Sequence, residues 1–372
     1  MNVPLPAPRV LILIQALGRG GAEQQLLSLA PYLDFEVAFV DSRAPALRGS
    51  IESHGHLVHD LRGNGGLAWS LRLRRLVRSR GIDIVHTFSP RSAAIARIAL
   101  AATGVQLAHS EQAMWPSYHP MTRLINAVTY WRNRRVTAVS QGVVASMRLP
   151  GPLTRLLPFP PVEVLHNSVD LAALDSSRIS RDEARQRLGL ADGQPVVGTV
   201  ANFKPVKGHV HLIAAARPVQ DAIPDVRFVL IGEGTEEGRL RAQVEHLGLR
   251  DSVLFAGMRE DAADLVAAFD IFVLPSLYEG FGVALLEAMA AGTAIVASRT
   301  GGIPEVLGDD EHGLLVEPGD SSGLAEVLVS LLNDPTRRGA LAENARTRAN
   351  AFDARATAAK SREIYASIAA TP

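Results

Sequence analysis

Two glutamates stand eight positions apart in the stretch LPSLYEGFGVALLEAMAAG (274–292), which carries no other charge: Glu279 and Glu287. The plainest interpretation is one acid at a helix start and one solvated helix residue. A carboxylate also accepts two or more hydrogen bonds, and the neighbouring hydroxyls of a ribose suit one bidentate carboxylate. The pattern therefore favours two groups that bind hydroxyls.

The segment between the two acids predicts a phosphate site. Gly280 and Gly282 flank Phe281 in a tight turn, and VALLEAMA (283–290) has the apolar density of a helix buried against a sheet. The first backbone N–H groups of that helix, from Gly282 and Val283 onward, lack partners within it and lie at its positive end. A phosphate held there, with sugars on either side, describes a nucleotide sugar.

Two lysines form a second group with chemistry, in FKPVKGH (203–209). The chain has only three lysines against 35 arginines, and Lys204 and Lys207 lie within one turn that Pro205 stiffens and Gly208 ends. The compact lysine ammonium suits phosphate oxygens. The turn is expected to bind a phosphate, although two solvated loop cations would give the same sequence.

Other glycine-containing loops could approach a ligand closely. In ALGRGGAEQQ (16–25), Gly18, Gly20 and Gly21 favour either phosphate contact or a tight turn, and the third glycine of a dinucleotide fingerprint is absent. In IGEGTEEG (231–238), Gly232 and Gly234 again permit close backbone approach.

Further candidates follow other apolar runs. Met258 and Arg259 could frame a planar base through their backbone groups. In the first half of the chain, LAHSEQ (107–112) offers His109 and Glu111 as contacts for a sugar, and His86 offers another. His109 has the better ring geometry for a hydroxyl and is therefore expected as a catalytic residue, although a lone histidine after a strand is often structural.

These residues need elements that bring them together, and the sequence predicts two parallel sheets covered by helices. Short apolar runs alternate with helical patterns throughout the chain. The expected strands are 9–15, 36–41, 56–61, 83–88, 105–110, 136–140 and 162–167 in the first half, then 195–202, 226–232, 252–257, 270–275, 294–298 and 313–316. Ligands of such α/β sheets bind beyond the carboxyl ends of the strands.

Length and pattern divide the chain into two doubly wound domains. Its 372 residues exceed what one core usually organises. We expect a first domain over 1–172, a nucleotide-binding domain over 173–350, and a terminal helix over 351–372 that packs back onto the first domain.

Composition excludes several classes of protein. No apolar run approaches the roughly 18 residues of a membrane span, and the absence of cysteine excludes disulfides and thiolate sites and fits a reducing compartment. We therefore expect a cytoplasmic protein.

The two halves of the chain differ in charge. Residues 1–170 hold 18 Lys or Arg against 10 Asp or Glu, whereas residues 171–372 hold 20 against 28. The two halves are expected to face different partners.

Two arginine-rich segments concentrate the positive charge, LRLRRLVRSR (71–80) and WRNRR (131–135). They are either solvated helix faces or a surface for anionic lipid at the inner face of the cell membrane, to which Trp115 and Trp131 would add exposed aromatic rings. An aromatic content of 5% and the lack of a stacking platform argue against nucleic acid.

The motifs together resemble glycosyltransferase family 4, retaining enzymes of the GT-B architecture with two facing Rossmann-like domains. The resemblance rests on E-x7-E at Glu279 and Glu287. Further matches are GGAE (20–23), VSQGV (139–143), HNSVD (166–170), KPVKGH (204–209), GGIPEVL (301–307) and HGLLVEPGD (312–320). It implies transfer of a sugar from a nucleotide sugar, UDP-linked rather than GDP-linked by preference, to a glycan or lipid-linked acceptor of envelope or exopolysaccharide synthesis.

The resemblance also implies residue roles. Glu279 would contact the transferred sugar together with Gly280 and Phe281, Glu287 would bind the ribose, and Lys207 the diphosphate. Many members carry arginine where this chain has Asn202, so Lys204 is expected to supply the second cation. Retention would proceed by front-side attack.

No metal or other cofactor is expected, because the chain contains no Asp-x-Asp pair to clamp one. A nucleotide-sugar epimerase and a non-catalytic protein that binds sugar nucleotides are the alternatives. An epimerase is not expected to carry the E-x7-E helix, and retained donor binding without turnover would indicate the second alternative.

Overall fold

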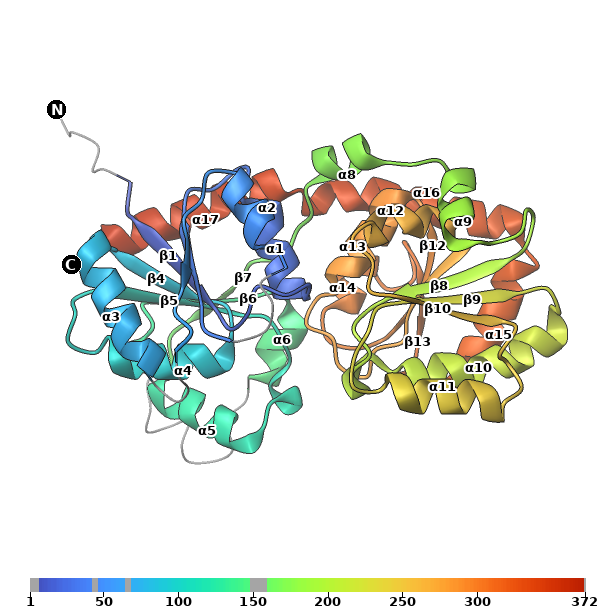
Figure 1. Ribbon diagram of the computed structural model, residues 1–372, viewed down its shortest axis with the longest axis horizontal. Helices are drawn as coiled ribbons and strands as arrows, with labels where there is room; N and C mark the ends of the chain where they lie inside the picture. The colour runs from blue at the N-terminus through green and yellow to red at the C-terminus, as the bar shows by residue number, and fades with distance from the viewer. Residues whose placement is uncertain (1–6, 42–45, 64–67, 148–158, 371–372) are drawn as a thin grey trace. The chain divides into compact units, whose positions relative to one another are not determined.

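The computed structural model describes residues 7–41, 46–63, 68–147 and 159–370. The chain divides into two compact units (Figure 1): one holds the residues up to Ser168 and those from Ala354 onward, and the other holds Val169–Asp353. Each unit is built on one parallel sheet. Each of the thirteen strands expected from the sequence is present among the described residues, with ends that differ by at most three residues.

The first unit has a seven-stranded sheet in the order β3-β2-β1-β4-β5-β6-β7. Its strands are β1 (Val10–Ile14), β2 (Glu36–Phe39), β3 (Val58–Asp60), β4 (Ile84–Thr87), β5 (Gln106–Glu111), β6 (Arg135–Ala138) and β7 (Val162–Val164). The helices described are α1 (Gly21–Leu29), α2 (Arg48–Ser53), α3 (Ala68–Arg80), α4 (Pro90–Ala99), α5 (Pro120–Thr129), α6 (Gln141–Ser146) and α17 (Ala354–Ala369), with 3₁₀ turns η1 (Trp115–Ser117) and η2 (Tyr130–Arg132).

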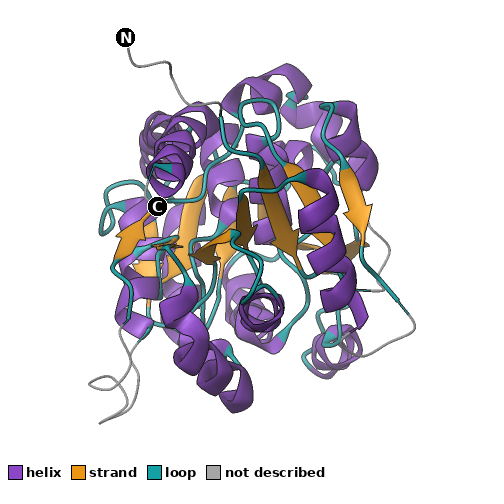
Figure 2. Ribbon diagram, turned by 90° about the vertical axis from the view of Figure 1, so that its left-hand side faces the viewer, coloured by secondary structure: helices purple, strands orange, loops and turns teal. Residues whose placement is uncertain are grey.

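Helices cover both faces of this sheet, as Figure 2 shows. Successive strand residues point to opposite faces, so Ile12 packs in the cluster that includes Ile364 of α17, and Leu13 packs in the cluster that includes Leu73 of α3. Burial on both faces explains why β1 reads as the unbroken apolar run VLILI.

The second unit has a six-stranded sheet in the order β10-β9-β8-β11-β12-β13. Its strands are β8 (Val196–Val200), β9 (Arg227–Ile231), β10 (Val253–Gly257), β11 (Ile271–Leu274), β12 (Ala294–Ser298) and β13 (Leu314–Val316). The helices described are α8 (Leu171–Ser177), α9 (Arg181–Leu188), α10 (His209–Ala222), α11 (Glu237–His246), α12 (Ala262–Leu265), α13 (Val283–Ala291), α14 (Ile303–Leu307), α15 (Ser321–Leu332) and α16 (Pro335–Ala349). The chain order reverses direction between β8 and β11, which is where a doubly wound sheet opens a ligand crevice.

The terminal helix α17 packs on the first unit through β4 and α1. Its Tyr365 hydroxyl lies 2.7 Å from Nδ1 of His86, and the other ring nitrogen of His86 lies 2.9 Å from Oγ of Ser110. Protein groups thus occupy both nitrogens of this buried ring. His86, a sequence candidate for sugar contact, joins the helix to the sheet in this structure.

We expect His86 to make the first unit less stable in acid. Burial, and secondarily the nearby His109, lowers the pKa of His86 to about 3, whereas the ring titrates near 6.5 when unfolded. Below pH 6.5 the unfolded chain takes up a proton that the folded chain does not, so the free energy of unfolding falls by about 1.4 kcal/mol per pH unit until the folded pKa is reached.

Urea unfolding at about pH 7.5 and about pH 5.5 measures this effect, and tryptophan fluorescence follows the first unit, which contains Trp69, Trp115 and Trp131. The variant His86→Gln, which does not titrate, should lose this part of the pH dependence. An identical pH dependence in wild type and variant would contradict the assignment.

Candidate functional site

Two loops meet at the point where the strand order of the second unit reverses. The 3₁₀ turn η3 (Pro205–Lys207) follows β8, and the loop 275–282 follows β11. The Leu277 N–H donates a hydrogen bond of 2.8 Å to the Val206 carbonyl. The lysine turn and the first glutamate of the E-x7-E pattern therefore belong to one local structure.

Gly208 makes this contact between the loops feasible for two separate reasons. Its φ of 66° lies in the left-handed region, which side chains disfavour. A Cβ at this position would also stand 2.0 Å from the Pro275 carbonyl oxygen, closer than atoms can approach. The glycine after the lysine turn is thus required by the path of the chain.

Lys207 and Glu279 form an ion pair at the centre of the site. The Lys207 Nζ lies 2.5 Å from Oε2 of Glu279, and the Ser276 hydroxyl donates to the same oxygen at 3.1 Å. Both charged side chains retain some exposure, 25% for Lys207 and 11% for Glu279. A ligand can therefore reach either charge.

Lys204 is exposed, and no carboxylate in the described part of the chain pairs with it. It precedes η3, within three residues of Lys207. The turn thus presents one paired and one unpaired ammonium at the carboxyl edge of the sheet.

Glu287 lies in the second turn of α13, half-buried. Within the described residues, no hydrogen-bond donor or cation contacts its carboxylate, and burial raises its pKa to about 7. A partly buried carboxyl group without donors is costly to ionise, and ligand hydroxyls could supply the missing hydrogen bonds. This geometry suits the hydroxyl-binding role expected from the sequence.

The first turn of α13 has no side-chain cap for its backbone N–H groups. Gly282 caps the helix in the left-handed conformation, with φ of 88°, and no side chain caps the first turn, which begins at Val283. Phe281 is buried, and its ring packs edge-on against Phe352 at a centroid distance of 5.5 Å. The Phe281 ring is therefore engaged within the protein, and contact of this residue with a sugar stays a prediction.

Two loop glycines, Gly232 and Gly234, serve contacts within the protein. A Cβ on Gly232 would lie 2.1 Å from the Ala201 carbonyl oxygen, and one on Gly234 would lie 2.4 Å from that of Phe203. The Phe203 N–H also donates to the Glu233 carbonyl at 2.8 Å. The loops after β8 and β9 are thus fastened together beside the lysine turn.

The residues expected near a base follow β10. Met258 is exposed, whereas the Arg259 guanidinium makes two hydrogen bonds of 2.9 Å to the carboxylate of Asp261. The side chain of Arg259 is engaged in this pair. The expectation that backbone groups of these residues frame a base stays a prediction.

The glycine loop of ALGRGGAEQQ belongs to the first unit. Gly18 and Gly20 do not need positive φ values, and a Cβ on Gly18 would meet no atom within 4 Å. A Cβ on Gly20 would meet only the flexible carboxylate of Glu23, which lies in the first turn of α1. Gly21 is the first residue of that helix. The fold alone does not explain glycine at position 18.

The other first-unit candidates, His109 and Glu111, lie in a buried polar network. The Glu111 carboxylate accepts hydrogen bonds from Trp115 Nε1 and the Tyr130 hydroxyl, each at 2.8 Å, and from the Tyr118 hydroxyl. Burial acts to raise the pKa of Glu111, but these bonds and His109 outweigh it and leave the pKa lowered. Glu111 is therefore a satisfied buried anion.

His109 has no exposed surface in this network. Its Nδ1 lies 2.9 Å from the Thr87 carbonyl, its Nε2 lies 3.5 Å from Oε2 of Glu111, and burial lowers its pKa. A sugar could contact the ring only after the surrounding chain moved, so its catalytic role stays a prediction.

The expectation that Trp115 is exposed is wrong, because its indole is buried against Glu111, whereas Trp131 is exposed as expected.

Sequence reasoning missed two hydroxyls of the site. Besides Ser276, which holds Glu279, the Thr300 hydroxyl donates to the Leu277 carbonyl at 3.1 Å and fixes the loop after β11 to the loop after β12. Both residues closely follow a strand of the sheet, which is the signal that could have identified them.

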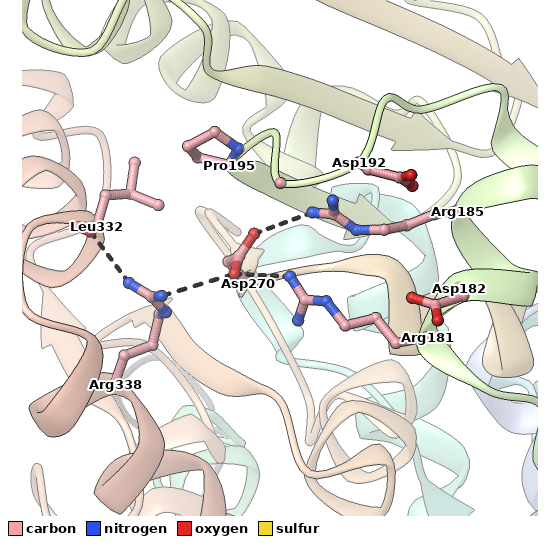
Figure 3. Close-up of a pocket in the computed structure, with 9 residues that line it drawn as sticks. Arg181, Asp182, Arg185, Asp192, Pro195, Asp270, Leu332 and Arg338 are labelled. Carbon is pink, nitrogen blue, oxygen red and sulfur yellow. Dashed lines mark hydrogen bonds and ion pairs between the residues drawn. The ribbon is translucent and has the colours of Figure 1, made fainter.

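A cavity of about 350 Å³ lies at the opposite, amino-terminal ends of the strands (Figure 3). The Asp270 carboxylate accepts a hydrogen bond of 2.7 Å from the Arg181 guanidinium there. Guanidinium nitrogens of Arg185 and Arg338 lie 3.4 and 3.7 Å from its oxygens. Three arginines and three aspartates line the cavity, so its charges balance. We interpret it as an ion-pair cluster that joins α9 and α16 to β11.

Comparison with known proteins places this geometry in a family. The family described as Glycosyl transferases group 1 matches residues 180–348, and Glycosyltransferase Family 4 matches residues 19–173. The D-inositol 3-phosphate glycosyltransferase of Xylanimonas cellulosilytica is 30% identical over 389 residues, which cover 96% of this chain and 90% of the relative.

The name of a second relative describes an enzyme that acts on a lipid-linked sugar. It is the N-acetylgalactosamine-N,N'-diacetylbacillosaminyl-diphospho-undecaprenol 4-alpha-N-acetylgalactosaminyltransferase of Campylobacter jejuni, 27% identical over 92% of this chain and 95% of the relative. Several other curated relatives are matched over only about half of their own length, from 50% to 56%.

Among solved structures, Anabaena Alr3699/HepE in complex with UDP-glucose superposes with a TM-score of 0.85 at 26% identity, covering 96% of this chain and 99% of that one. The two Rossmann-like sheets and the terminal helix that returns to the first unit are those of the GT-B fold. This chain belongs to glycosyltransferase family 4.

Proposed function

We propose that this protein transfers a sugar from a nucleoside-diphosphate sugar to a glycan or lipid-linked acceptor in envelope or exopolysaccharide synthesis. The pairing of Lys207 with Glu279 at the sheet's switch point carries the proposal. One group suits the diphosphate and the other suits sugar hydroxyls. A UDP-sugar is the favoured donor, supported by the UDP-glucose complex of the structural neighbour, and a GDP-sugar is the alternative.

The ion pair at the site suggests how the donor is engaged. A diphosphate carries more negative charge than one carboxylate, so it draws the Lys207 ammonium away from Glu279. Glu279, still held by Ser276, then has acceptor capacity for the hydroxyls of the donor sugar. Binding thus exchanges one charge contact for two contacts with the ligand.

The same cations support departure of the nucleoside diphosphate. As the bond from the sugar to the phosphate breaks, negative charge develops on the leaving oxygen, and Lys207, Lys204 and the N–H groups of Gly282 and Val283 stabilise it. Glu279 positions the sugar together with Gly280 and the backbone of Phe281. The acceptor attacks from the same face, which retains the configuration.

The remaining parts of the donor fall to neighbouring loops. Glu287 accepts the ribose hydroxyls, and the backbone at Met258 and Arg259 frames the base. Gly20 and Gly21 of the first unit approach the diphosphate, where the unexplained glycine at position 18 supports an open ligand-facing loop. His109 is proposed as a catalytic contact of the first unit.

The acceptor is proposed to be presented at the inner face of the cell membrane. The lipid-linked acceptor in the name of the Campylobacter jejuni relative supports this class of acceptor. No helix in the described ranges is both long and apolar enough to cross a bilayer. Contact with an anionic membrane would therefore be peripheral, through the arginine-rich segments 71–80 and 131–135.

A donor screen with site variants tests the proposed reaction. The purified chain, mixed with a panel of UDP-sugars and GDP-sugars and a glycan acceptor, should release one nucleoside diphosphate. Lys207→Ala and Glu279→Gln should each lower kcat/KM about 100-fold or more, because each removes a preorganised contact of the transition state. Lys360→Ala removes the third lysine, which lies on α17 outside the site, and serves as the matched control. Unimpaired transfer by Glu279→Gln would contradict its role.

The half-buried Glu287 carboxylate should destabilise the folded chain at alkaline pH while it contributes to donor binding. Because burial raises its pKa from 4.5 to about 7, the folded chain favours the protonated form, and this stabilising preference is lost as pH rises through 7. Glu287→Gln should therefore raise the thermal unfolding temperature at about pH 8 more than at about pH 5, while raising the KM for the donor about tenfold or more. Glu326→Gln, an exposed glutamate of α15, is the control. Equal shifts at both pH values would refute the assignment.

Transfer should not require a divalent metal. Lys204, Lys207 and the start of α13 supply positive charge at the diphosphate, and the described residues contain no cluster of three or more metal-ligating side chains. Initial rates should stay equal, within about twofold, after treatment with EDTA and after addition of Mg²⁺ or Mn²⁺. Abolition by EDTA and restoration by one of these ions would overturn the prediction.

A further inference from the structure

Helix α5 of the first unit exposes apolar side chains and buries polar ones, which is the opposite of an ordinary surface helix. Its apolar residues Met121, Leu124 and Val128, spaced to lie on one face, are 57%, 49% and 40% exposed. Its polar residues Asn126 and Thr129 are buried instead. An apolar face turned outward along three turns requires an explanation.

The buried polar face is held in place by a charge. Arg97 of α4 is buried, and its guanidinium donates to Asn126 Oδ1 at 2.7 Å, to Thr129 Oγ1 at 3.2 Å and to Asn133 Oδ1 at 3.1 Å. It also lies 4.7 Å from the centre of the Tyr130 ring. Rolling α5 to bury its apolar face would remove two of the three acceptors of this buried cation, Asn126 and Thr129, which is unfavourable. The apolar face is therefore kept at the surface.

The apolar surface extends to the segments beside α5. Trp131 of η2 is 51% exposed, and its indole N–H donates to the Val128 carbonyl at 3.1 Å. Ile98 of the adjoining helix α4 is 61% exposed. Because the indole N–H already has an acceptor, the tryptophan ring can enter an apolar phase without losing a hydrogen bond.

The charge of this region is one-sided. Between positions 84 and 162 the sequence has a single acidic residue, Glu111, and that carboxylate is fully buried. Arg91 and Arg134 are exposed, Arg123 and Arg132 are partly so, and no acidic side chain in the described ranges pairs with any of these four. An apolar face among unpaired arginines complements a surface that is apolar inside and negative at its border.

The same features argue against a second copy of the chain as the partner. A symmetric dimer through α5 would bring the arginines of one copy against those of the other, which is repulsive.

The arginine-rich helix α3 differs from α5, because its apolar residues Trp69, Leu73 and Val77 are buried. Of its large apolar residues only Leu71 is exposed.

We propose that α4, α5 and η2 form a docking face for an anionic lipid bilayer. Met121, Leu124, Val128 and Trp131 enter the boundary of the lipid chains, while the surrounding arginines contact phosphate headgroups. Residues 131–134 take part in this face, whereas Arg135 lies beside α17 on the other face of the sheet. Helix α3 does not insert. The inference deepens the proposed lipid-linked acceptor and rests on it for its biological use.

Vesicle binding tests the docking face without donor or acceptor. The full chain is mixed with phosphatidylcholine vesicles containing about 30% phosphatidylglycerol or none, and binding is followed by sedimentation and by tryptophan fluorescence. Because Trp69 and Trp115 are buried, a shift of the emission to shorter wavelength reports on Trp131. We expect binding to the anionic vesicles, a shift of emission, and weaker binding as salt rises.

Variants separate insertion from charge attraction. The double variant Leu124→Gln/Val128→Gln should bind anionic vesicles at least about tenfold more weakly. Leu57→Gln changes an exposed leucine outside both arginine-rich segments and should bind like wild type. Trp131→Phe should keep the binding and lose the emission shift. These side chains are exposed, so circular dichroism should be unchanged.

Several results would overturn the proposal. They are no binding by wild type, equal binding to neutral and anionic vesicles, undiminished binding by the double variant, or a dimer in size-exclusion chromatography that the double variant dissociates. Sugar transfer to a water-soluble acceptor, measured on the same samples, separates this failure from failure of the proposed reaction. The double variant should retain that transfer.

Discussion

The site of the second unit depends on how closely the chain after β8 approaches the chain after β11. At Gly208 the two backbones are so near that no side chain fits against the Pro275 carbonyl. This approach brings Lys207 within 2.5 Å of Glu279, although 72 residues separate them in sequence. Parallel order places both loops at one edge of the sheet, and the glycine allows them to touch. The chemistry of the pair follows from this contact between backbones.

The sequence predicts the frame of the molecule well because its signals are repeated and local. Each strand is a short apolar run, and burial on both faces of a parallel sheet forces that pattern wherever the strand lies. The residues at the carboxyl edge of the second unit were also recognised, because lysine is rare in this chain and charge is rare in the stretch 274–292. A residue type that is rare in the surrounding sequence can thus be singled out without a structure.

What the sequence did not reveal is which polar side chains satisfy one another inside the first unit. His86 and His109 follow apolar runs just as a ligand-binding residue would, but one bonds to Tyr365 of the distant helix α17 and the other lies against Glu111. Trp115 was expected at the surface and instead donates to Glu111. Such partners come from chain segments that pattern analysis cannot pair. The reversed helix α5 has the same origin, since its inward face is decided by Arg97 of another helix.

The use of lysine at the proposed diphosphate site follows from the same physical reasoning. The chain employs arginine for fixed contacts, as at Arg97, where the planar guanidinium meets several acceptors in one geometry. Lys207 has a different task if its partner changes from Glu279 to a phosphate when the donor binds. An ammonium on a flexible stem has no fixed fork to satisfy and can change partner by a small rotation. An arginine bound bidentately to Glu279 would hold that carboxylate more firmly and would oppose its release to the sugar. A lysine at position 207, in a chain with only three lysines, therefore suits the proposed site, where the positive charge has to change partner.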